Sequence, residues 1–503
     1  MRKLLSFFCL SIISFFLVAQ QGNFIVSGQV TDNTTKEALI GVNIISDDIG
    51  TSTNIDGNYT LKLPYGKHEI TFKYIGYEVV TKKININTDS LLKINLQLNS
   101  SSEQLNTVVV SAGKFNQKLE EITVSMEVIK PNLIENKSSS NIETAMEQIP
   151  GLNITDGQAN IRGGSGWSYG AGTRVLVMVD DMPLISGDAG QVQWNLIATE
   201  NVNQVEIIKG ASSALYGSSA LNGIINIRTA YPKQSEIDKN PSLGFTKVNL
   251  NFGVIDFAKR KAINWYEGKR RSFKGVEFLQ SLKYENIDLS FGGNVFKDDG
   301  YRQNEKTDRN RFNFNSLFKS NKVSGLSYGI NGNFLFESTA SVLIWDGYDR
   351  AYIALNNDVT KTGGDSYNVD PFMTYIIGNN RHSLRTRYLK VINDNESRDS
   401  LSNLDNRSKS YYSDYQWQKN IKKYNLSFTA GITNEIIFAQ SKAFQGKNFR
   451  RNHSLYTQMD KKIGNLNIST GARYEYFSLN SETKHIIRGD TCLLYTSDAA
   501  DER

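Results

Sequence analysis

The feature that most constrains the fold is a long alternation of apolar and polar residues between Phe245 and Phe477. In the run from Leu326 to Phe336, one face carries Leu326, Tyr328, Ile330, Phe334 and Phe336, while Ser327, Asn331 and Asn333 face the other way. Successive side chains of a strand point to opposite faces, so such runs predict a sheet with one apolar and one polar face. Strands of about 10 residues with the apolar face outward are typical of a transmembrane antiparallel β-barrel with a wet lumen.

The connections between these runs alternate in length, which also favours a barrel with short periplasmic turns and long extracellular loops. Short connections are predicted at Glu285-Asn286, Ser320–Gly325, Asn379–Arg381, Lys419–Lys423 and Lys461–Asn465. Long connections are predicted at Lys297–Asn310, Glu337–Asn368, Asn393–Ser408 and Ala439–Arg451. The pattern predicts about 11 strands in residues 240–490.

A plugged outer-membrane barrel closes at about 22 strands, so we expect residues 240–490 to form the first half of a barrel. An open half-barrel leaves strand edges that a bilayer cannot satisfy. Residues 491–503 break the alternation, and we interpret them as a non-native tail on a truncated reading frame. The alternative is a genuinely shorter protein.

The N-terminus predicts export. Residues 1–19 combine a basic start with an apolar run that ends at Ala19, as in a secretory signal peptide. The run is short for a membrane anchor, and no later segment approaches about 18 continuous apolar residues. The two cysteines are Cys9, inside this segment, and Cys492, inside the suspected tail, so no disulfide framework is expected.

Residues 24–98 predict a seven-stranded β-sandwich, because short alternating runs are separated by Asn, Asp and Gly turns. The pattern Gly28, Val30, Asp32, Gly41, Asp56, Gly57, Tyr59 and Leu61 resembles the carboxypeptidase-regulatory-like domain. The resemblance implies either a periplasmic interaction module or a folded spacer.

The segment Asn201–Thr229 places a small-residue stretch between two β-branched runs, Val205–Lys209 and Gly223–Thr229, which predicts two strands around a compact turn. The sequence resembles the end of the plug domain of TonB-dependent outer-membrane receptors, and we assign the α/β plug to residues 120–232. The resemblance rests on the plug signature Gly210, Ala214, Leu215, Tyr216, Gly217, Gly223 and Asn226. Within the plug, Asn141–Gln148 predicts a short helix.

The linker at 99–119 contains a short β-branched segment that is suited to strand addition at a partner's sheet edge. It resembles a TonB box, through which the energy-transducing protein TonB pulls on the plug. Its residues are Leu105, Asn106, Thr107, Val108, Val109, Val110, Ser111 and Ala112. The alternative is the last strand of the preceding sandwich.

Two further groups of plug residues are singled out by the resemblance. Arg162 matches a family arginine that pairs with barrel glutamates, and Lys209 stands where a second arginine is usual, without the bidentate fork of a guanidinium. Two segments, 163–173 and 186–194, are candidate substrate loops or ordinary packed loops. Their candidate contacts are Trp167, Tyr169, Asp188 and Trp194.

No pattern predicts an enzyme. The four histidines are far apart without zinc-site spacing, and neither a nucleophile elbow nor a phosphate loop occurs. No cofactor or metal is expected. The formal net charge of +6 is not concentrated in an arm or cluster, so nucleic acid is not an expected partner.

The resemblance implies an outer-membrane importer of a scarce solute, driven by TonB and its inner-membrane energising complex, with its N-terminal domain in the periplasm. The plug sequence is closer to the general receptor form than to the SusC-like form, which favours an iron-siderophore, haem or cobalamin. The alternatives are a SusC-like glycan importer, which implies a surface lipoprotein partner, and a non-transporting β-rich adhesin. Fold alone does not choose the ligand.

Overall fold

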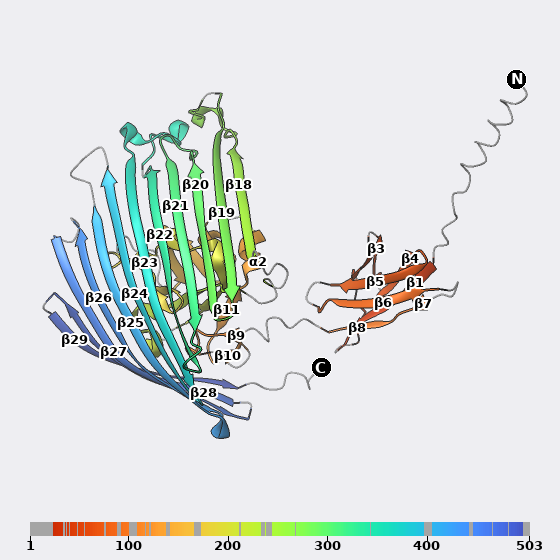
Figure 1. Ribbon diagram of the computed structural model, residues 1–503. Coiled ribbons are helices and arrows are strands. Elements are labelled where there is room, and N and C mark those ends of the chain that lie inside the picture. The colour runs from red at the N-terminus through yellow and green to blue at the C-terminus, as the bar shows by residue number, and fades with distance from the viewer. Residues whose placement is uncertain are drawn as a thin grey trace, which may run out of the picture. The chain divides into compact units, whose positions relative to one another are not determined.

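The computed structural model describes two compact units, Met1–Thr107 and Val108–Arg503 (Figure 1). The described residues are 24–99 and 108–495, except 34–35, 37, 40, 48, 55, 75–76, 88–91, 116, 120–121, 137–140, 165–172, 211–212, 233–236, 238–243, 267, 343, 397–404, 442–445, 465 and 481. The signal segment 1–19 and the first three TonB-box residues, Leu105 to Thr107, lie outside them.

The first unit is a sandwich of two four-stranded sheets, with the orders β4-β1-β7 (with β8 also on β1) and β3-β2-β5-β6. Its strands are β1 (Phe24–Asp32), β2 (Asn43–Ser46), β3 (Ile49–Ser52), β4 (Asn58–Leu63), β5 (Gly66–Lys73), β6 (Val80–Ile86), β7 (Leu92–Lys93) and β8 (Leu96–Leu98). Alternate residues of β1 are buried against a core that includes Ile44, Leu61 and Phe72. Eight strands replace the predicted seven, because the last apolar run is divided where Ile94 N donates to Ser27 O.

The plug, the first part of the second unit, is an α/β fold around the five-stranded sheet β11-β16-β17-β14-β15. Its strands are β9 (Val108–Val109), β10 (Gln117–Lys118), β11 (Met126–Ile129), β12 (Leu152–Thr155), β13 (Gln158–Ile161), β14 (Val175–Val179), β15 (Met182–Pro183), β16 (Val202–Ile208) and β17 (Gly223–Thr229). Its helices are α2 (Pro131–Asn136), α3 (Ile142–Met146), α4 (Ser213–Tyr216) and the 3-10 turns η2 (Trp194–Leu196), η3 (Thr199–Asn201) and η4 (Ser218–Ala220).

Two local predictions for the plug are confirmed. The β-branched runs form β16 and β17, which pair antiparallel in the middle of the sheet. The helix predicted at Asn141–Gln148 is α3, capped where the Asn141 side chain accepts from Glu143 N at 2.9 Å. A cap of this kind satisfies a donor that the helix itself leaves free.

Beyond the plug, twelve strands form one sheet, here called the wall, in which each strand pairs antiparallel with its neighbours in sequence order (Figure 1). They are β18 (Phe245–Ile255), β19 (Arg271–Tyr284), β20 (Ile287–Asp298), β21 (Lys306–Lys319), β22 (Leu326–Ser341), β23 (Thr360–Ile377), β24 (Asn380–Glu396), β25 (Asn406–Ile421), β26 (Leu426–Ser441), β27 (Gly446–Ile463), β28 (Leu466–Leu479) and β29 (Glu482–Tyr495). The described parts of its connections include the 3-10 turns η5 (Lys261–Ile263), η6 (Tyr348–Arg350), η7 (Leu355–Asn357) and η9 (Lys422–Tyr424). The antiparallel sheet expected from the alternation is therefore present.

Some long loops are shorter than predicted, because the neighbouring strands extend into them. Strands β26 and β27 extend to Ser441 and from Gly446, so the long loop predicted at Ala439–Arg451 is mostly strand. Similarly, β24 and β25 take up both ends of the loop predicted at Asn393–Ser408. These extensions carry no apolar alternation, but their backbones still pair, and polar side chains such as Thr362 and Asn395 bond across strands. Strand β29 likewise continues past residue 490, where the sequence pattern ended the sheet.

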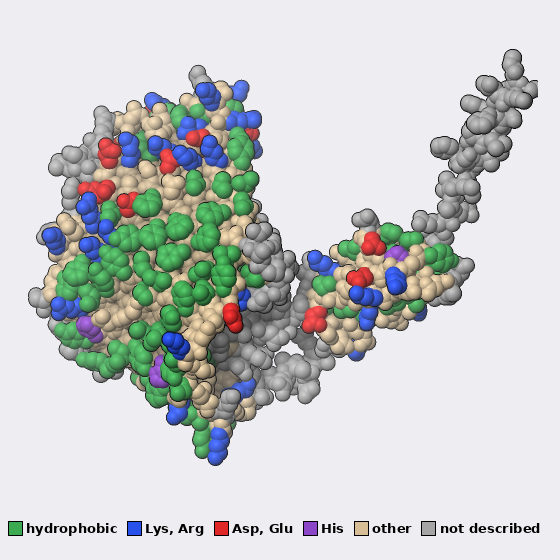
Figure 2. All heavy atoms as spheres, in the orientation of Figure 1, with side chains coloured by type: hydrophobic (Ala, Val, Ile, Leu, Met, Phe, Trp, Pro, Cys, Tyr) green, Lys and Arg blue, Asp and Glu red, His purple; other side chains and the backbone are tan. Residues whose placement is uncertain are grey.

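The two faces of the wall differ as the alternation predicts. Apolar side chains are exposed on the outer face, including Leu250 (76%), Phe252 (74%) and Phe336 (56%). Figure 2 shows such side chains gathered in a band across the sheet, with charged ones beyond it toward the long loops. On the inner face Asn313 and Asn331 are buried against the plug side. None of the helices in the described ranges is long and apolar enough to cross a membrane.

Candidate functional site

The described part of the predicted TonB box, Val108–Ala112, is docked against the plug. Glu206 on β16 is fully buried, and its Oε2 accepts from the backbone N–H of Val110 at 3.0 Å and of Ser111 at 2.7 Å. Val108 and Val109 form β9, which pairs with β10 rather than with the sandwich. The docked segment is therefore not an open strand, and an edge-to-edge partner would need it to detach first.

Two residues of the plug signature complete this docking site. Asn226 donates its amide to Ser111 Oγ at 2.9 Å and to Asp181 Oδ1 at 2.9 Å. The hydroxyl of Tyr216 donates to Ser111 O at 2.7 Å. The sequence resemblance had marked both positions, but it gave no reason for their chemistry. Their polar groups bind the chain that precedes the plug.

A buried charge network lies directly behind the docked segment. Arg228 on β17 donates to both carboxylate oxygens of Asp181 at 2.7 Å, and its Nε lies 3.5 Å from Glu206 Oε1. Burial opposes ionisation of Asp181, but Arg228 and the wall residue Arg385 outweigh it and hold the pKa of this carboxyl well below its usual range. Asp181 in turn raises the pKa of Arg228, although burial opposes the charge. Asp181 and Arg228 therefore both carry their charges at neutral pH.

Lys114 fastens the same segment to the wall. Its side chain is 2% exposed, and its ammonium lies 2.6 Å from Asp414 Oδ2 on β25. The ammonium also faces the rings of Tyr216 and Tyr456, at 4.9 and 4.5 Å from their centroids. The Lys114 carbonyl accepts from Gln416 at 3.2 Å. The sequence reasoning missed this contact, because a lone lysine in a linker carries no signal for a partner 300 residues away.

A second buried ion pair joins the plug to the wall at Glu200 and Arg311. Both side chains are 1% exposed. Arg311 on β21 also donates to Ile197 O at 2.5 Å, and Asn313 donates to the other oxygen of Glu200 at 2.5 Å. The charge pattern of an isolated strand does not reveal such a pair, so the sequence reasoning missed it as well.

Arg387 on β24 makes a third set of plug contacts. Its guanidinium donates to Asp370 beside it on the wall, and to the plug carbonyls of Met182 at 2.8 Å and Pro183 at 3.1 Å. These charged and amide contacts lie beside an apolar part of the plug–wall boundary, where Leu335, Leu389 and Val391 of the wall join the plug core.

The two predicted plug anchors do not reach the wall. Arg162 is exposed and donates to Ser125 Oγ, within the plug, at 2.8 Å. Lys209 forms an ion pair with Glu127 and donates to Pro150 O at 2.8 Å, again within the plug. Among the described residues neither side chain pairs with a wall glutamate. At Arg311 and Arg387 the cation is on the wall and the carboxylate or carbonyl is on the plug, whereas in the Lys114–Asp414 pair the carboxylate is on the wall.

Of the four candidate substrate contacts, the structure describes Asp188 and Trp194. Trp167 and Tyr169 lie outside the described residues, and Asp188 is half-buried. Trp194 was expected on a loop, but it is 6% exposed in the plug core and donates its indole N–H to Gly157 O at 2.8 Å. An apolar ring with one satisfied polar atom is a core residue.

The remaining signature residues form a tight corner between β16 and β17. Gly210 lies two residues beyond the end of β16, Ala214, Leu215 and Tyr216 belong to the buried helix α4, and Gly217 follows it. Gly223 adopts φ +143°, and a Cβ there would lie 2.4 Å from Ile208 O. Only glycine fits this close approach.

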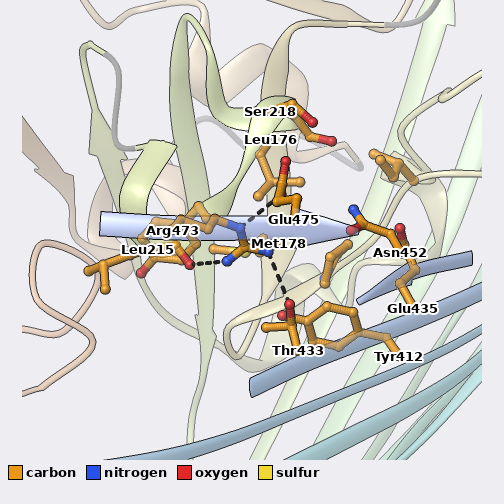
Figure 3. A pocket seen from close by; sticks show the side chains of 14 residues that line it. Leu176, Met178, Leu215, Ser218, Tyr412, Thr433, Glu435, Asn452, Arg473 and Glu475 are labelled. Atoms are coloured by element: carbon orange, nitrogen blue, oxygen red, sulfur yellow. Dashed lines mark hydrogen bonds and ion pairs between the residues drawn. The ribbon is translucent and has the colours of Figure 1, made fainter. Parts of the chain in front are cut away.

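A small cavity lies between α4, β14 and strands β25 to β28 (Figure 3). Arg473 crosses it and donates to Glu475 at 2.8 Å, to Thr433 at 3.0 Å and to Leu215 O at 3.2 Å. The volume of this cavity is about 40 Å³, whereas ligand pockets usually measure about 300–1,000 Å³. The plug therefore packs closely against this part of the wall. No group of three or more metal-binding side chains occurs in the part of the chain that the structure describes.

Family comparisons agree with both folded parts. The family model described as the TonB-dependent Receptor Plug Domain matches residues 118–224. The CarboxypepD_reg-like domain model matches residues 26–110. This match extends beyond the predicted end of the sandwich at residue 98 and includes Val110 of the docked segment.

Three curated relatives are similar to parts of the chain. The TonB-dependent receptor P3 of Formosa agariphila is 25% identical over 61% of this chain and 32% of its own length. The vitamin B12 transporter BtuB of Vibrio vulnificus is 32% identical over 34% of this chain and 30% of its own length. The TonB-dependent receptor SusC of Bacteroides thetaiotaomicron is 30% identical over 46% of this chain and 24% of its own length. The chain thus spans about a third or less of each.

Solved structures share the fold at low sequence identity. The siderophore receptor PirA from Pseudomonas aeruginosa has a TM-score of 0.52 at 15% identity, over 72% of this chain and 58% of that one. The ferric-catecholate import receptor Fiu from E. coli K12 has a TM-score of 0.54 at 13% identity, over 76% of this chain and 68% of that one.

Proposed function

Because the chain belongs to the TonB-dependent receptors of the Bacteroidetes type, we propose that it forms the plug and part of the barrel of an importer that moves a scarce solute across the outer membrane. Such receptors are outer-membrane proteins. The relatives named above are transport receptors rather than enzymes, and the proposed process changes no covalent bond. No catalytic residue is assigned.

The observation that carries this proposal is the group of buried polar contacts in the plug–wall boundary. Its strongest contacts are the ion pairs Lys114–Asp414 and Glu200–Arg311. Water offers hydrogen bonds to all of these groups once they separate, whereas an apolar boundary of this size would resist hydration. A plug held in this way is closed at rest and is able to move under an applied force.

We further propose that TonB applies this force through the segment Leu105–Ala112. Support comes from the position of the docked residues Val110 and Ser111, which precede the plug in sequence and bond directly to strand β16 of its sheet through Glu206. Pulling on this segment loads the plug sheet first and the Lys114 contact with the wall next.

For the solute, we propose an iron-siderophore, haem or cobalamin rather than a glycan. Support comes from the general-receptor form of the plug signature between Gly210 and Asn226. The SusC-like similarity keeps a glycan as the second candidate, since SusC is among the relatives. A surface lipoprotein partner belongs only to that second candidate.

The test is growth of a strain in which the gene is deleted at its own locus. We expect the deletion to impair growth when iron is chelated and haem or a siderophore is supplied, or when cobalamin limits growth. The same defect is expected when TonB is removed. Impaired growth only on a glycan would favour the second candidate, and growth that never depends on the gene together with TonB would refute import.

A further inference from the structure

Two pairs of lysines lie directly opposite each other on neighbouring strands of the wall. Lys390 on β24 is opposite Lys409 on β25. Lys274 on β19 is opposite Lys297 on β20. Like charges in this position destabilise a sheet unless something neutralises them. Two such pairs at the same end of the wall therefore require an explanation.

All four lysines point away from the plug. The neighbours of Lys390 in sequence, Leu389 and Val391, are 2% and 1% exposed and belong to the plug core cluster. The neighbours of Lys409, Ser408 and Ser410, are also buried. Because successive residues of a strand face opposite ways, both lysines lie on the outer face, which the membrane surrounds.

Lys274 and Lys297 lie on the outer face as well, because their neighbours Gly275 and Phe296 are buried.

No carboxylate among the described residues pairs with Lys390 or Lys409. Within the described ranges neither lysine forms an ion pair. The ammonium of Lys390 faces the ring of Tyr367, 5.5 Å from its centroid. Asp394, the nearest acid on the same strand, is already paired with Arg407 at 2.9 Å. Asp365 lies one row nearer the loops, opposite Ile392. In the second pair, Lys297 contacts Asp308 at 3.3 Å.

The level of the pair in the membrane follows from the aromatic residues beside it. Tyr388 and Tyr411 are opposite each other two positions nearer the short turns, with ring centroids 4.9 Å apart. Their row continues through Tyr367 and Phe334, with ring centroids 5.9 Å apart. Aromatic rows of this kind lie where the hydrocarbon meets the lipid head groups. The charged zone above the apolar band is visible in Figure 2.

We propose that the Lys390–Lys409 pair binds the phosphate of an outer-leaflet lipid head group, and that the Lys274–Lys297 pair is a second, weaker site of the same kind. Side chains that face each other across two strands have Cβ atoms about 5 Å apart, so both ammonium groups reach one phosphate. A bound phosphate dianion neutralises the repulsion, while the acyl chains pack on the apolar band below. Lysine binds phosphate as a point charge.

The test compares binding of lipid A with its phosphates, the same lipid after enzymatic dephosphorylation, and inorganic phosphate to the purified full chain. We expect the phosphorylated lipid to bind tightest, with an affinity that falls as salt rises. The Lys390→Gln/Lys409→Gln variant is expected to bind about 25-fold more weakly, at about fivefold per lysine. The matched control, Lys419→Gln/Lys461→Gln, removes two exposed lysines near the short turns and is expected to bind normally.

A charge reversal separates binding from a merely structural role. Lys409→Glu places a carboxylate opposite Lys390, so without lipid it is expected to raise the melting temperature of the chain while it abolishes binding of the phosphorylated lipid. Equal binding of the phosphorylated and dephosphorylated lipids, or unchanged binding by the double Gln variant, would overturn the proposal. Inorganic phosphate that binds as tightly as the lipid would overturn the assignment to a head group.

Discussion

The docking of Val110 and Ser111 on Glu206 gives the sharpest prediction. The variant Glu206→Gln keeps the shape of the side chain but removes its charge. Two backbone donors, Val110 N and Ser111 N, then lose a charged acceptor at 3.0 and 2.7 Å. Hydrogen bonds to charged groups contribute about 1.5–3 kcal/mol and neutral ones about 0.5–1.5 kcal/mol. The variant is therefore expected to weaken docking by about 2 kcal/mol in total, or roughly 1 kcal/mol per bond.

This loss is measured by hydrogen exchange of the Val110 and Ser111 amides. A decrease of about 2 kcal/mol in the free energy of local opening makes exchange roughly 30-fold faster. The control is Glu127→Gln on the neighbouring strand β11, which removes a carboxylate that pairs with Lys209 and does not bond to the segment. It is expected to leave both amides unchanged. Unchanged exchange in Glu206→Gln would refute the reasoning that this carboxylate holds the segment.

Three further predictions follow from buried groups. Glu200→Ala leaves Arg311 buried without its counter-ion, so unfolding in detergent is expected to cost about 3–5 kcal/mol less; a loss below about 1 kcal/mol would contradict a buried pair. Lys114→Met is expected to speed hydrogen exchange across residues 108–118, and Lys114→Met/Asp414→Asn is expected to recover part of the protection; no change would show that the wall contact is not a constraint. Burial raises the pKa of Tyr59 from 10.0 to about 12, so its contribution to the stability of residues 24–99 is present below pH 10 and is lost as pH rises through about 12; Tyr59→Phe is expected to remove that part of the pH dependence in alkaline unfolding followed by circular dichroism, and identical pH profiles would contradict it.

The sequence predicted those parts of the fold that depend on local pattern. Alternation identifies the wall strands, because burial of one face repeats every second residue, as in Leu326–Phe336. Glycine and β-branched residues identify β16, β17 and the corner at Gly223. The strand ends beyond the apolar band were missed, because polar side chains on both faces leave no periodic signal while backbone pairing continues.

The site was predicted only where a family pattern marked it. Asn226 and Tyr216 were singled out, and the structure gives them a role in docking Ser111. Lys114 and Arg311 were not singled out, since their partners are distant in sequence and a single charge is usually solvated. Arg162 and Lys209 were assigned to the wall by resemblance, but in this chain their bonds lie within the plug.

The central claim is that the plug moves relative to the wall during import, and a reversible cross-link tests it most directly. Gly187 of the plug lies against β25, where a Cβ would be 3.3 Å from Ser408 Cβ but also 2.4 Å from Ile437 Cγ2. Disulfides join Cβ atoms about 3.5–4.5 Å apart, and Ile437→Leu removes the obstructing methyl group.

The measurement is TonB-dependent uptake by cells that carry Gly187→Cys/Ser408→Cys/Ile437→Leu at the native locus, before and after reduction, with Ile437→Leu alone as the control. We predict that the oxidised variant binds solute without importing it and that reduction restores uptake. Import at the control rate by the fully cross-linked protein would contradict a moving plug.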